Sequence, residues 1–410
     1  MDNRRVVVTG LGAITPVGNN VKDYRNSLTN SVCGIDYITK FDTTEFKVKI
    51  AAEIKNYEPT KFLTPVEIRR NDLYSQYALI AAGEAVEDSG IIGNIESERL
   101  GVYVGSGIGG INTMLAEYDK LNQKGPRWVS PLLVPMMISN IASGAIAIKY
   151  NARGVNLPVV LACSTSTNAI GEAYRAIKYD YADAIITGGS EASINRLAVA
   201  GFTSIMALST NPDPKTACRP FDKDRDGFIM GEGAGILVIE EYEHAKNRNA
   251  KIYAEITGYG NTCDAYHITA PQPDGDGAGR MLSQTLKQSD YSTNDKLYIN
   301  AHGTSTPLND KGETYAIKKV LGDEAYKIKI SSTKSMTGHL LGATGATEAI
   351  ATILTLKEGI IPPTINYNTK DEECDLDCVP NTAINSDLDI AVSVSLGFGG
   401  HNGGLAFRKV

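Results

Sequence analysis

The 410-residue sequence lacks an excess of positive charge. It contains 40 Lys and Arg against 47 Asp and Glu, which gives a formal net charge of −7 at pH 7. Nucleic-acid binding proteins usually present a strongly basic surface, so we expect no nucleic-acid partner. A local basic patch for an acidic protein partner remains compatible with this total.

A continuous apolar run of membrane-spanning quality is also missing. The longest window without charge, residues 128–148, contains Pro131, Pro135, Asn140 and several serines. Lipid cannot satisfy the polar groups that such residues leave open, so we expect a buried or interface segment and no membrane insertion. The opening residues MDNRRVVVTG contain neither an apolar signal core nor a transit segment, which predicts a cytoplasmic protein.

Paired cysteine patterns are absent as well. Of the six cysteines, only Cys374 and Cys378 lie close in sequence, and no second pair completes a zinc site. Without a secretion signal, a disulfide scaffold is not expected either. We therefore predict free thiols and no metal site.

Two cofactor-like motifs are incomplete. GSGIGG at residues 105–110 fits G-x-G-x-x-G, but no acidic residue follows at the end of a next strand, so a tight turn is favoured over a dinucleotide site. DKDRDG at residues 222–227 begins like a calcium loop, but position 12 is Gly233 and a strand follows in place of the exiting helix. Neither motif predicts a bound cofactor.

The order of elements predicts an α/β fold. Apolar runs typical of strands covered on both faces alternate with helical patterns, several of which end in glycine. The expected strands are residues 4–10, 100–107, 158–163, 182–189, 235–240, 296–303, 327–333 and 389–397. The expected helices include residues 73–90, 167–181, 310–322 and 343–359.

A weak internal echo divides the chain. PVVLACSTSTNAIGEAYRAIK in the first half and IKISSTKSMTGHLLGATGATEAIATILTLKEG in the second share the order strand, polar turn, helix. We therefore predict two similar α/β halves, residues 1–250 and residues 251–410.

A cysteine stands at one of these turns. If residues 158–162 form a strand and residues 164–178 a helix, Cys163 lies at the helix N-terminus, where backbone N–H groups and the macrodipole favour a thiolate. The same N–H groups can stabilise an oxyanion. A lone free cysteine is more often an inert core residue, so a role as nucleophile depends on its neighbours.

Two of the five histidines occupy similar turns. His302 follows an apolar run in AHGTST, and His339 lies in KSMTGHLLGATGA, both beside glycine. Either histidine alone could be a buried structural residue. The presence of a thiol or an imidazole at three similar strand-to-helix turns argues against a structural role for all three. The pattern predicts a cleft shared by one thiol and two imidazoles.

Six longer motifs of the sequence resemble those of a known family. ACSTSTNAIGEAYRAIK, YADAIITGGSEA, RPFDKDRDGFIMGEGAG, AHGTSTPLND, SSTKSMTGHLLGATGA and SLGFGGHNGGLAF are similar to motifs of the β-ketoacyl-acyl carrier protein synthases, most closely the elongating type II enzymes. The resemblance covers essentially the whole chain. It implies a thiolase-like fold of two halves, each with a five-stranded sheet, layered α-β-α-β-α, and a homodimer.

The resemblance also implies a mechanism and a partner. Such an acyltransferase of fatty acid biosynthesis binds no cofactor; its substrates are carried on the 4'-phosphopantetheine of acyl carrier protein. Cys163 would accept the acyl group, and malonyl-carrier protein would decarboxylate and attack it, which extends the chain by two carbons. His302 and His339 would donate from neutral rings to the malonyl thioester oxygen. The backbone N–H groups of Cys163 and Phe398 would form a second oxyanion hole.

Further residues match family positions. Lys334 is placed among the catalytic residues, with Glu348 as its supporting charged partner. The implied substrate-binding residues are Ile108, Thr269, Thr304, Thr306 and Phe398.

Docking of the acidic carrier protein is expected at Arg69 and Arg70, in EIRRND. Met206 stands where some relatives have a basic residue, so the strength of docking stays open.

Related functions remain to be weighed. A thiolase would need a C-terminal C-x-G, and the tail GFGGHNGG has no cysteine. An initiating synthase would have an asparagine where this chain has His339, and a non-enzymatic chain-length factor would lack Cys163. A ketosynthase of a specialised polyketide or aryl-polyene pathway would share every catalytic residue, so that alternative stays open, as does the preferred acyl chain.

Overall fold

A computed structural model describes residues 4–410; residues 1–3, at the start of the predicted N-terminal half, lie outside the described residues. The strands are β1 (Val6–Ile14), β2 (Asp36–Tyr37), β3 (Ile50–Ala51), β4 (Leu100–Gly105), β5 (Ala184–Glu191), β6 (Gly233–Glu241), β7 (Ala254–Cys263), β8 (Leu297–Asn300), β9 (Lys329–Ser331), β10 (Ile360–Ile361), β11 (Ile384–Asn385), β12 (Ile390–Gly397) and β13 (His401–Arg408).

The α-helices are α1 (Val21–Thr29), α2 (Pro65–Arg70), α3 (Leu73–Ser89), α4 (Ile111–Lys124), α5 (Leu133–Met137), α6 (Ile141–Tyr150), α7 (Thr165–Lys178), α8 (Arg196–Ser204), α9 (Tyr242–Asn247), α10 (Asp276–Gln288), α11 (Pro307–Leu321), α12 (Lys334–Thr337) and α13 (Thr344–Glu358). Short 3₁₀ turns are η1 (Pro59–Lys61), η2 (Ser97–Arg99), η3 (Pro126–Trp128), η4 (Ala162–Ser164), η5 (Gly322–Tyr326) and η6 (Leu341–Ala343).

Nine of the described strands form one sheet with the hydrogen-bonded order β4-β5-β6-β1-β7-β13-β12-β8-β9. The first four belong to the N-terminal part of the chain and the last five to the C-terminal part. Only three residue pairs, from Val6–Ile256 to Val8–Ala254, join β1 to β7. The sheet is therefore two sets of strands with a short junction between them.

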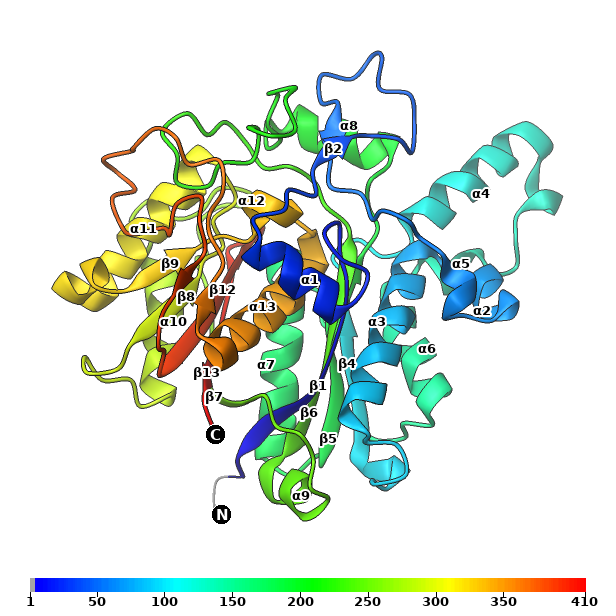
Figure 1. The fold of residues 1–410 in the computed structure, drawn as a ribbon. Helices are drawn as coiled ribbons and strands as arrows, with labels where there is room; N and C mark the ends of the chain where they lie inside the picture. Colours follow the sequence, from blue (N-terminus) through cyan, green and yellow to red (C-terminus); the bar gives the residue numbers. More distant parts are fainter. Residues whose placement is uncertain (1–3) are drawn as a thin grey trace.

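The helices complete five layers (Figure 1). Helices α3 and α6 cover β4, β5, β6 and β1 on one side, whereas α10 and α11 lie beyond the C-terminal strands on the other. Helices α7 and α13 contact each other and strands of both sets, so they form the middle layer. This arrangement is the α-β-α-β-α layering that the sequence resemblance implied.

Buried side chains alternate between the layers because successive residues of a strand point to opposite faces. Ile185 and Leu237 pack in the central core with α7 and α13, whereas Ile186 and Val238 pack against α3. Strands covered on both faces need continuous apolar sequence, and this explains the runs that predicted them.

The structure corrects one predicted strand, residues 158–163. The preceding residues lie beside β4, where Val102 N donates to the carbonyl of Val155 and Leu157 N donates to the carbonyl of Val102. Pairing stops at Pro158, which has no N–H group to donate. The N-terminal set therefore has four assigned strands and not the five that the resemblance implied.

The internal echo is visible in the middle layer. Helix α7 follows the 3₁₀ turn η4, and α13 follows η6. Each turn contains a non-glycine residue with positive φ, Ala162 at 49° and Leu341 at 50°. This sparsely populated conformation costs about 1–3 kcal/mol, so the packed surroundings must hold both turns.

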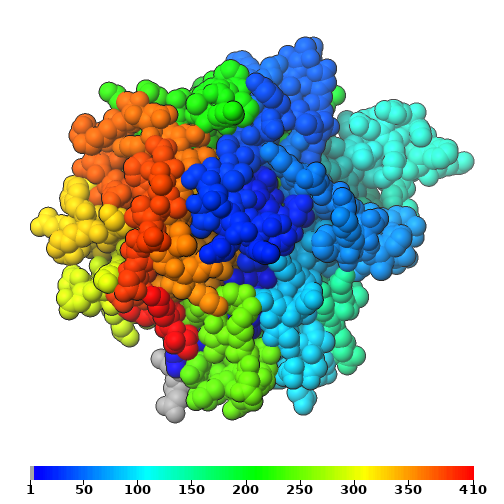
Figure 2. Space-filling model, viewed as in Figure 1, coloured from blue at the N-terminus to red at the C-terminus, as the bar shows by residue number. Residues whose placement is uncertain are grey.

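The uncharged window 128–148 begins at the last residue of η3 and contains α5 and most of α6. Val134 and Ile148 are exposed there, whereas Ala142, Ser143 and Ile146 are buried, so the segment lies at the surface with one side packed inward. The segment lies next to α4, which projects from one side of the molecule (Figure 2). Across residues 4–410, no helix combines the length and the apolar character needed to cross a membrane.

Both incomplete cofactor motifs have packing roles. A Cβ atom on Gly110 would lie 2.1 Å from the carbonyl oxygen of Met136, so this glycine allows α5 to approach closely. In the acidic loop, Asp222 accepts hydrogen bonds from the backbone N–H groups of Asn368 and Thr369, at 2.7 Å each. Its carboxylate thus fastens two segments of chain.

Candidate active site

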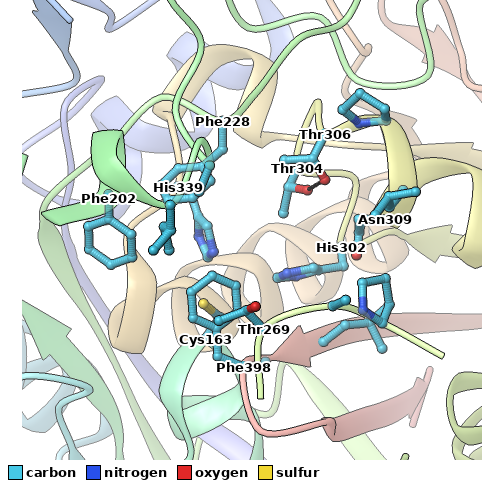
Figure 3. Close-up of a pocket in the computed structure, with 18 of the residues that line it drawn as sticks. Cys163, Phe202, Phe228, Thr269, His302, Thr304, Thr306, Asn309, His339 and Phe398 are labelled. Atoms are coloured by element: carbon cyan, nitrogen blue, oxygen red, sulfur yellow. Dashed lines mark hydrogen bonds between the residues drawn. The ribbon is translucent and has the colours of Figure 1, made fainter. Parts of the chain in front are cut away.

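A cavity of about 400 Å³ contains Cys163, His302 and His339 together (Figure 3). The three side chains come from the turns that follow β8 and precede α7 and α13. The imidazole rings lie nearly perpendicular with centroids 5.3 Å apart, and both point toward the thiol (Figure 3). The predicted convergence of three turns is thus present.

Cys163 lies in η4, directly before α7, at the floor of this cavity. Burial raises the pKa of its thiol to about 12, although Lys334 and the backbone N–H of Phe398 act in the opposite direction. The sequence favoured a thiolate from the helix N-terminus alone. In the folded chain desolvation outweighs that field, so the resting thiol is protonated.

Backbone N–H groups surround the thiol on one side. The backbone N–H of Phe398 acts to lower the pKa of the Cys163 thiol, and a Cβ atom on Gly397 would lie 3.2 Å from the backbone N of Cys163. Glycine at 397 therefore keeps the space beside these two donors open. The arrangement suits an oxygen that gains negative charge next to Cys163 Sγ.

His339 has a defined proton position. The N–H of Leu341 donates to Nδ1 at 3.3 Å, and Thr344 Oγ1 lies 2.9 Å from the same nitrogen. Burial and the charge of Lys334 hold the pKa of His339 well below its usual range. The neutral ring thus has its proton on Nε2, which faces the cavity.

His302 is fixed through its backbone. Its N–H and that of Gly303 donate to the two carboxylate oxygens of Glu313, at 2.7 and 2.8 Å. Burial, followed by the charge of Lys334 and the neighbouring His339, lowers the pKa of His302 well below its usual range. Both imidazoles are therefore neutral at physiological pH.

Lys334 and Glu348 form a fully buried ion pair behind His302. Lys334 Nζ donates to Glu348 Oε1 at 2.6 Å and to the carbonyl oxygen of His302 at 2.5 Å. Burial raises the pKa of Glu348 to about 7, against the opposing influence of Lys334. The pair supports His302, and the charge of Lys334 adds to burial in keeping both imidazoles neutral.

The predicted threonines line the approach to the thiol. Thr304 and Thr306 are joined by a 2.9 Å hydrogen bond between their hydroxyl oxygens, and Thr269 lies on the exposed loop opposite. Phe398 lines the cavity beside Phe202, with ring centroids 6.4 Å apart. These residues offer hydroxyl groups and an aromatic face to an elongated ligand.

Three predicted residues lie elsewhere. Ile108 is not among the residues that line the cavity; its backbone N–H donates to Glu191. Arg69 and Arg70 are exposed at the end of α2 and do not line the cavity. Their predicted roles in acyl binding and carrier docking stay predictions.

Several residues of this site were not predicted from the sequence. Phe202 and Phe228 line the cavity, and the ring of Phe228 meets His339 edge-on at 5.2 Å. Glu313 looked like one more solvated carboxylate on a helix, and no signal in the sequence distinguished it. Glu191 did give a signal, since it is a carboxylate at the end of a buried apolar strand.

Two family models match the chain. The model of the beta-ketoacyl synthase N-terminal domain matches residues 3–245, and that of the C-terminal domain matches residues 253–368. The chain is 52% identical over 408 residues to 3-oxoacyl-acyl-carrier-protein synthase 2 of Staphylococcus aureus (strain N315), with 99% of each chain covered.

Solved structures agree. The ishigamide ketosynthase/chain length factor superposes with a TM-score of 0.93 at 36% identity over 100% of both chains. A complex described as a type II PKS acyl-carrier protein with its ketosynthase bound to the hexaketide gives 0.91 at 34% identity over 100% of both chains. The predicted thiolase-like α/β fold is confirmed.

Proposed function

Because the chain belongs to the beta-ketoacyl synthase family, we propose that it catalyses the decarboxylative condensation of malonyl-acyl carrier protein with an acyl group held on Cys163. It is an acyltransferase of the condensing type, and its product is a 3-oxoacyl-acyl carrier protein two carbons longer than the acyl substrate. The observation that supports this most strongly is the single cavity that contains Cys163, His302 and His339.

The first half-reaction loads the enzyme. Cys163 Sγ attacks the carbonyl carbon of an acyl thioester, and a new carbon–sulfur bond forms while the bond to the carrier's sulfur breaks. Because the resting thiol is protonated, its proton leaves during the attack and ends on the carrier's sulfur. The N–H groups of Cys163 and Phe398 stabilise the oxyanion of the tetrahedral intermediate.

The second half-reaction extends the chain. The malonyl group loses carbon dioxide, and the electron pair of the broken bond delocalises onto the thioester oxygen. Neutral His302 and His339 donate hydrogen bonds to that oxygen, which strengthen as its charge develops. The carbanion then attacks the acyl-cysteine carbonyl, and the released Cys163 thiolate takes a proton.

Lys334 and Glu348 act in support. The ammonium group holds the main chain of His302 and disfavours a second positive charge on either ring. The enolate oxygen needs hydrogen-bond donors that keep their protons. A protonated imidazole could give its proton away at this step, whereas a neutral ring keeps its N–H group and only donates a hydrogen bond. Glu348 compensates the buried charge of Lys334.

Acyl carrier protein delivers both substrates on its 4'-phosphopantetheine arm, and the enzyme binds no cofactor of its own. Thr269, Thr304 and Thr306 offer hydroxyl groups for the amides of the arm. The mouth of the cavity has an exposed apolar rim, Ile205, Met206 and Leu308. Arg69 and Arg70 add a basic contact for the acidic carrier.

The functional unit is a homodimer of chains that each comprise two halves, residues 1–250 and 251–410. Exposed Leu157 and Val160 support this proposal, because they lie at the end of, and just after, the short segment that pairs with the edge strand β4. An uncovered apolar edge is a ready site for strand pairing with a second copy. Ile108 would line the acyl pocket, as the family resemblance implies.

The test is a mass measurement. Purified protein is incubated with C4 to C18 acyl-carrier proteins, and intact mass with peptide mapping locates the acyl group. Malonyl-carrier protein is then added, and the released product is weighed. Acylation at Cys163 followed by a product two carbons longer supports the proposal. Failure of every carrier-bound chain to acylate the protein overturns it and favours a dedicated pathway partner.

A further inference from the structure

The carboxylate of Glu191 lies buried at the meeting point of the active-site turns and has no role in the mechanism above. It is the last residue of β5 and has no solvent exposure. A buried carboxylate must be compensated by charges or by hydrogen-bond donors. Five donors from three segments of the chain surround this one.

The two carboxylate oxygens divide these donors unequally. Oε2 accepts from the backbone N–H groups of Gly107 at 2.9 Å and Gly342 at 3.1 Å. Oε1 accepts from the hydroxyl groups of Ser106 at 3.1 Å and Ser193 at 2.9 Å, and from the N–H of Ile108 at 3.3 Å. The backbone N–H groups are fixed and can only donate to the carboxylate. The serine hydroxyl groups can rotate, so each can also accept a hydrogen bond from a protonated carboxyl group.

The segments that Glu191 joins flank the reacting groups. Gly342 belongs to η6, three residues after His339, and Gly107 belongs to the loop after β4. A Cβ atom on Gly342 would lie 2.3 Å from the backbone N of Gly107, and one on Gly107 would lie 3.6 Å from the carbonyl oxygen of Ala162. The loop after β4 is thus in contact with η6 and close to the turn that holds Cys163.

We propose that Glu191 is a positioning residue for the condensation, whose ionised carboxylate holds the loop Ser106–Ile108 and η6 in register with the Cys163 turn. This inference rests on the proposed function, because it concerns the rate of that reaction. Glu191 touches no substrate. It acts through the backbone of the residues that surround Cys163 and His339.

Protonation of this carboxylate has a defined structural consequence. The proton goes to Oε1, because the rotatable hydroxyls of Ser106 and Ser193 can accept from it, whereas Oε2 faces two fixed N–H groups. The N–H of Ile108 then loses its acceptor. Condensation therefore slows as the pH falls through the pKa of Glu191, which burial raises to about 6.

Two further carboxyl groups near the active site, Glu313 and Glu348, change charge close to that pH, so the Glu191 variants are needed to identify its share of the acid limb. Cys163 on η4 and Tyr74 on α3 feel its charge, and burial raises the pKa of each to about 12. His339, next along the chain to η6, has a pKa well below its usual range. Glu313 and Glu348 lie behind His302, with pKa values raised to about 7.

The Glu191→Gln variant mimics the protonated state, since an amide NH₂ replaces Oε1 while the amide oxygen keeps the two glycine N–H groups. We expect its condensation rate to lose the part of the acid limb that is centred near pH 6 and to be about tenfold below the wild-type rate at pH 7.5, the effect of one lost charge-assisted hydrogen bond. Glu191→Ala loses both sets of contacts and falls further.

The Ser193→Ala variant is a second, independent test. The Ser193 hydroxyl lowers the pKa of Glu191, so its removal moves the acid limb of the rate profile to higher pH while the rate on the plateau stays close to wild type. A purely structural role for Glu191 predicts no such displacement. Glu87→Gln, an exposed carboxylate on α3, is the matched control and leaves the profile unchanged.

The experiment measures single-turnover condensation on the acylated wild-type enzyme and on these variants from pH 5 to pH 8, with intact mass recording acylation of Cys163 in every sample. A wild-type limb near pH 6 that disappears in Glu191→Gln and shifts in Ser193→Ala supports the inference. An unchanged limb in Glu191→Gln, or wild-type rates in Glu191→Ala, overturns it. Absence of acylation or product in the wild type at pH 7.5 would instead overturn the proposed function.

Discussion

Lys334 Nζ lies 2.5 Å from the carbonyl oxygen of His302, so the ammonium group contacts the backbone of this histidine and not its ring. The same nitrogen is 2.6 Å from Glu348 Oε1, and both side chains are almost completely buried. One buried cation thus holds the His302 turn in position and adds to burial in keeping two imidazoles neutral. Its removal has separable effects on stability and on chemistry.

Replacement of Lys334 by methionine should destabilise the protein and stop condensation. It leaves Glu348 buried without its partner, and breaking a buried pair in this way costs about 3–5 kcal/mol. Urea denaturation measures the loss of stability. The double variant Lys334→Met, Glu348→Met removes both charges and should recover most of the stability but none of the activity. A single variant as stable as the wild type would contradict this view of the pair.

The raised pKa of Cys163 predicts its reactivity. Only the thiolate reacts with iodoacetamide, so the alkylation rate at Cys163 should rise about tenfold per pH unit from pH 7 to pH 10 without a plateau. Mass spectrometry of the labelled peptide follows this rate. Cys163→Ala should lose the label and the acyl-enzyme, whereas Cys263→Ala, an exposed cysteine, should keep acyl transfer. A plateau below pH 9 would show that the helix field dominates after all.

Gly397→Ala should impair both half-reactions. The added methyl group would lie 2.9 Å from the carbonyl oxygen of Leu161 and 3.2 Å from the backbone N of Cys163, so one of these must move. Loss of one oxyanion-hole donor typically lowers kcat by about 100-fold to 1,000-fold, which is the expected scale. Gly201→Ala is the control, because its Cβ atom would meet nothing within 4 Å. Equal turnover by both variants would exclude the proposed oxyanion hole.

Glu191 should also make the free energy of unfolding depend on pH. Its pKa rises from 4.5 in the unfolded chain to about 6 in the fold because burial disfavours the ionised form. The native state therefore binds this proton more tightly, so its contribution is complete below pH 4.5 and is lost as the pH rises through 6. The shift corresponds to about 2 kcal/mol.

The measurement is the free energy of unfolding of the wild type minus that of Glu191→Gln, at pH 4 and at pH 7. This difference should fall by about 2 kcal/mol with rising pH, while the shared contributions of other groups cancel. A difference that stays constant or rises would mean that Glu191 is not the buried carboxylate described here.

Strands were predicted correctly where continuous apolar side chains mark them. They were missed where a helix packs directly on the backbone of the strand. The apolar runs around Ile185, Leu237 and Ile299 predicted β5, β6 and β8. Strands β7 and β13 escaped notice because polar residues and glycines interrupt their apolar residues, so neither contains a continuous apolar run. A Cβ atom on Gly260 would lie 2.2 Å from the carbonyl oxygen of Met281, so α10 packs directly on the backbone there. Close approach between distant segments leaves no periodic apolar pattern.

The sequence by itself determined which groups we propose for the chemistry, because a thiol and two imidazoles at glycine-flanked turns are a local pattern. The resemblance to a family then extended this to Lys334, Phe398 and the threonines. Tertiary structure alone decided that desolvation outweighs the helix field at Cys163, and that Glu313 and Glu191 hold the turns in place. Burial and hydrogen bonding between residues more than 80 positions apart set those properties of Glu191, and no local stretch of sequence specifies them.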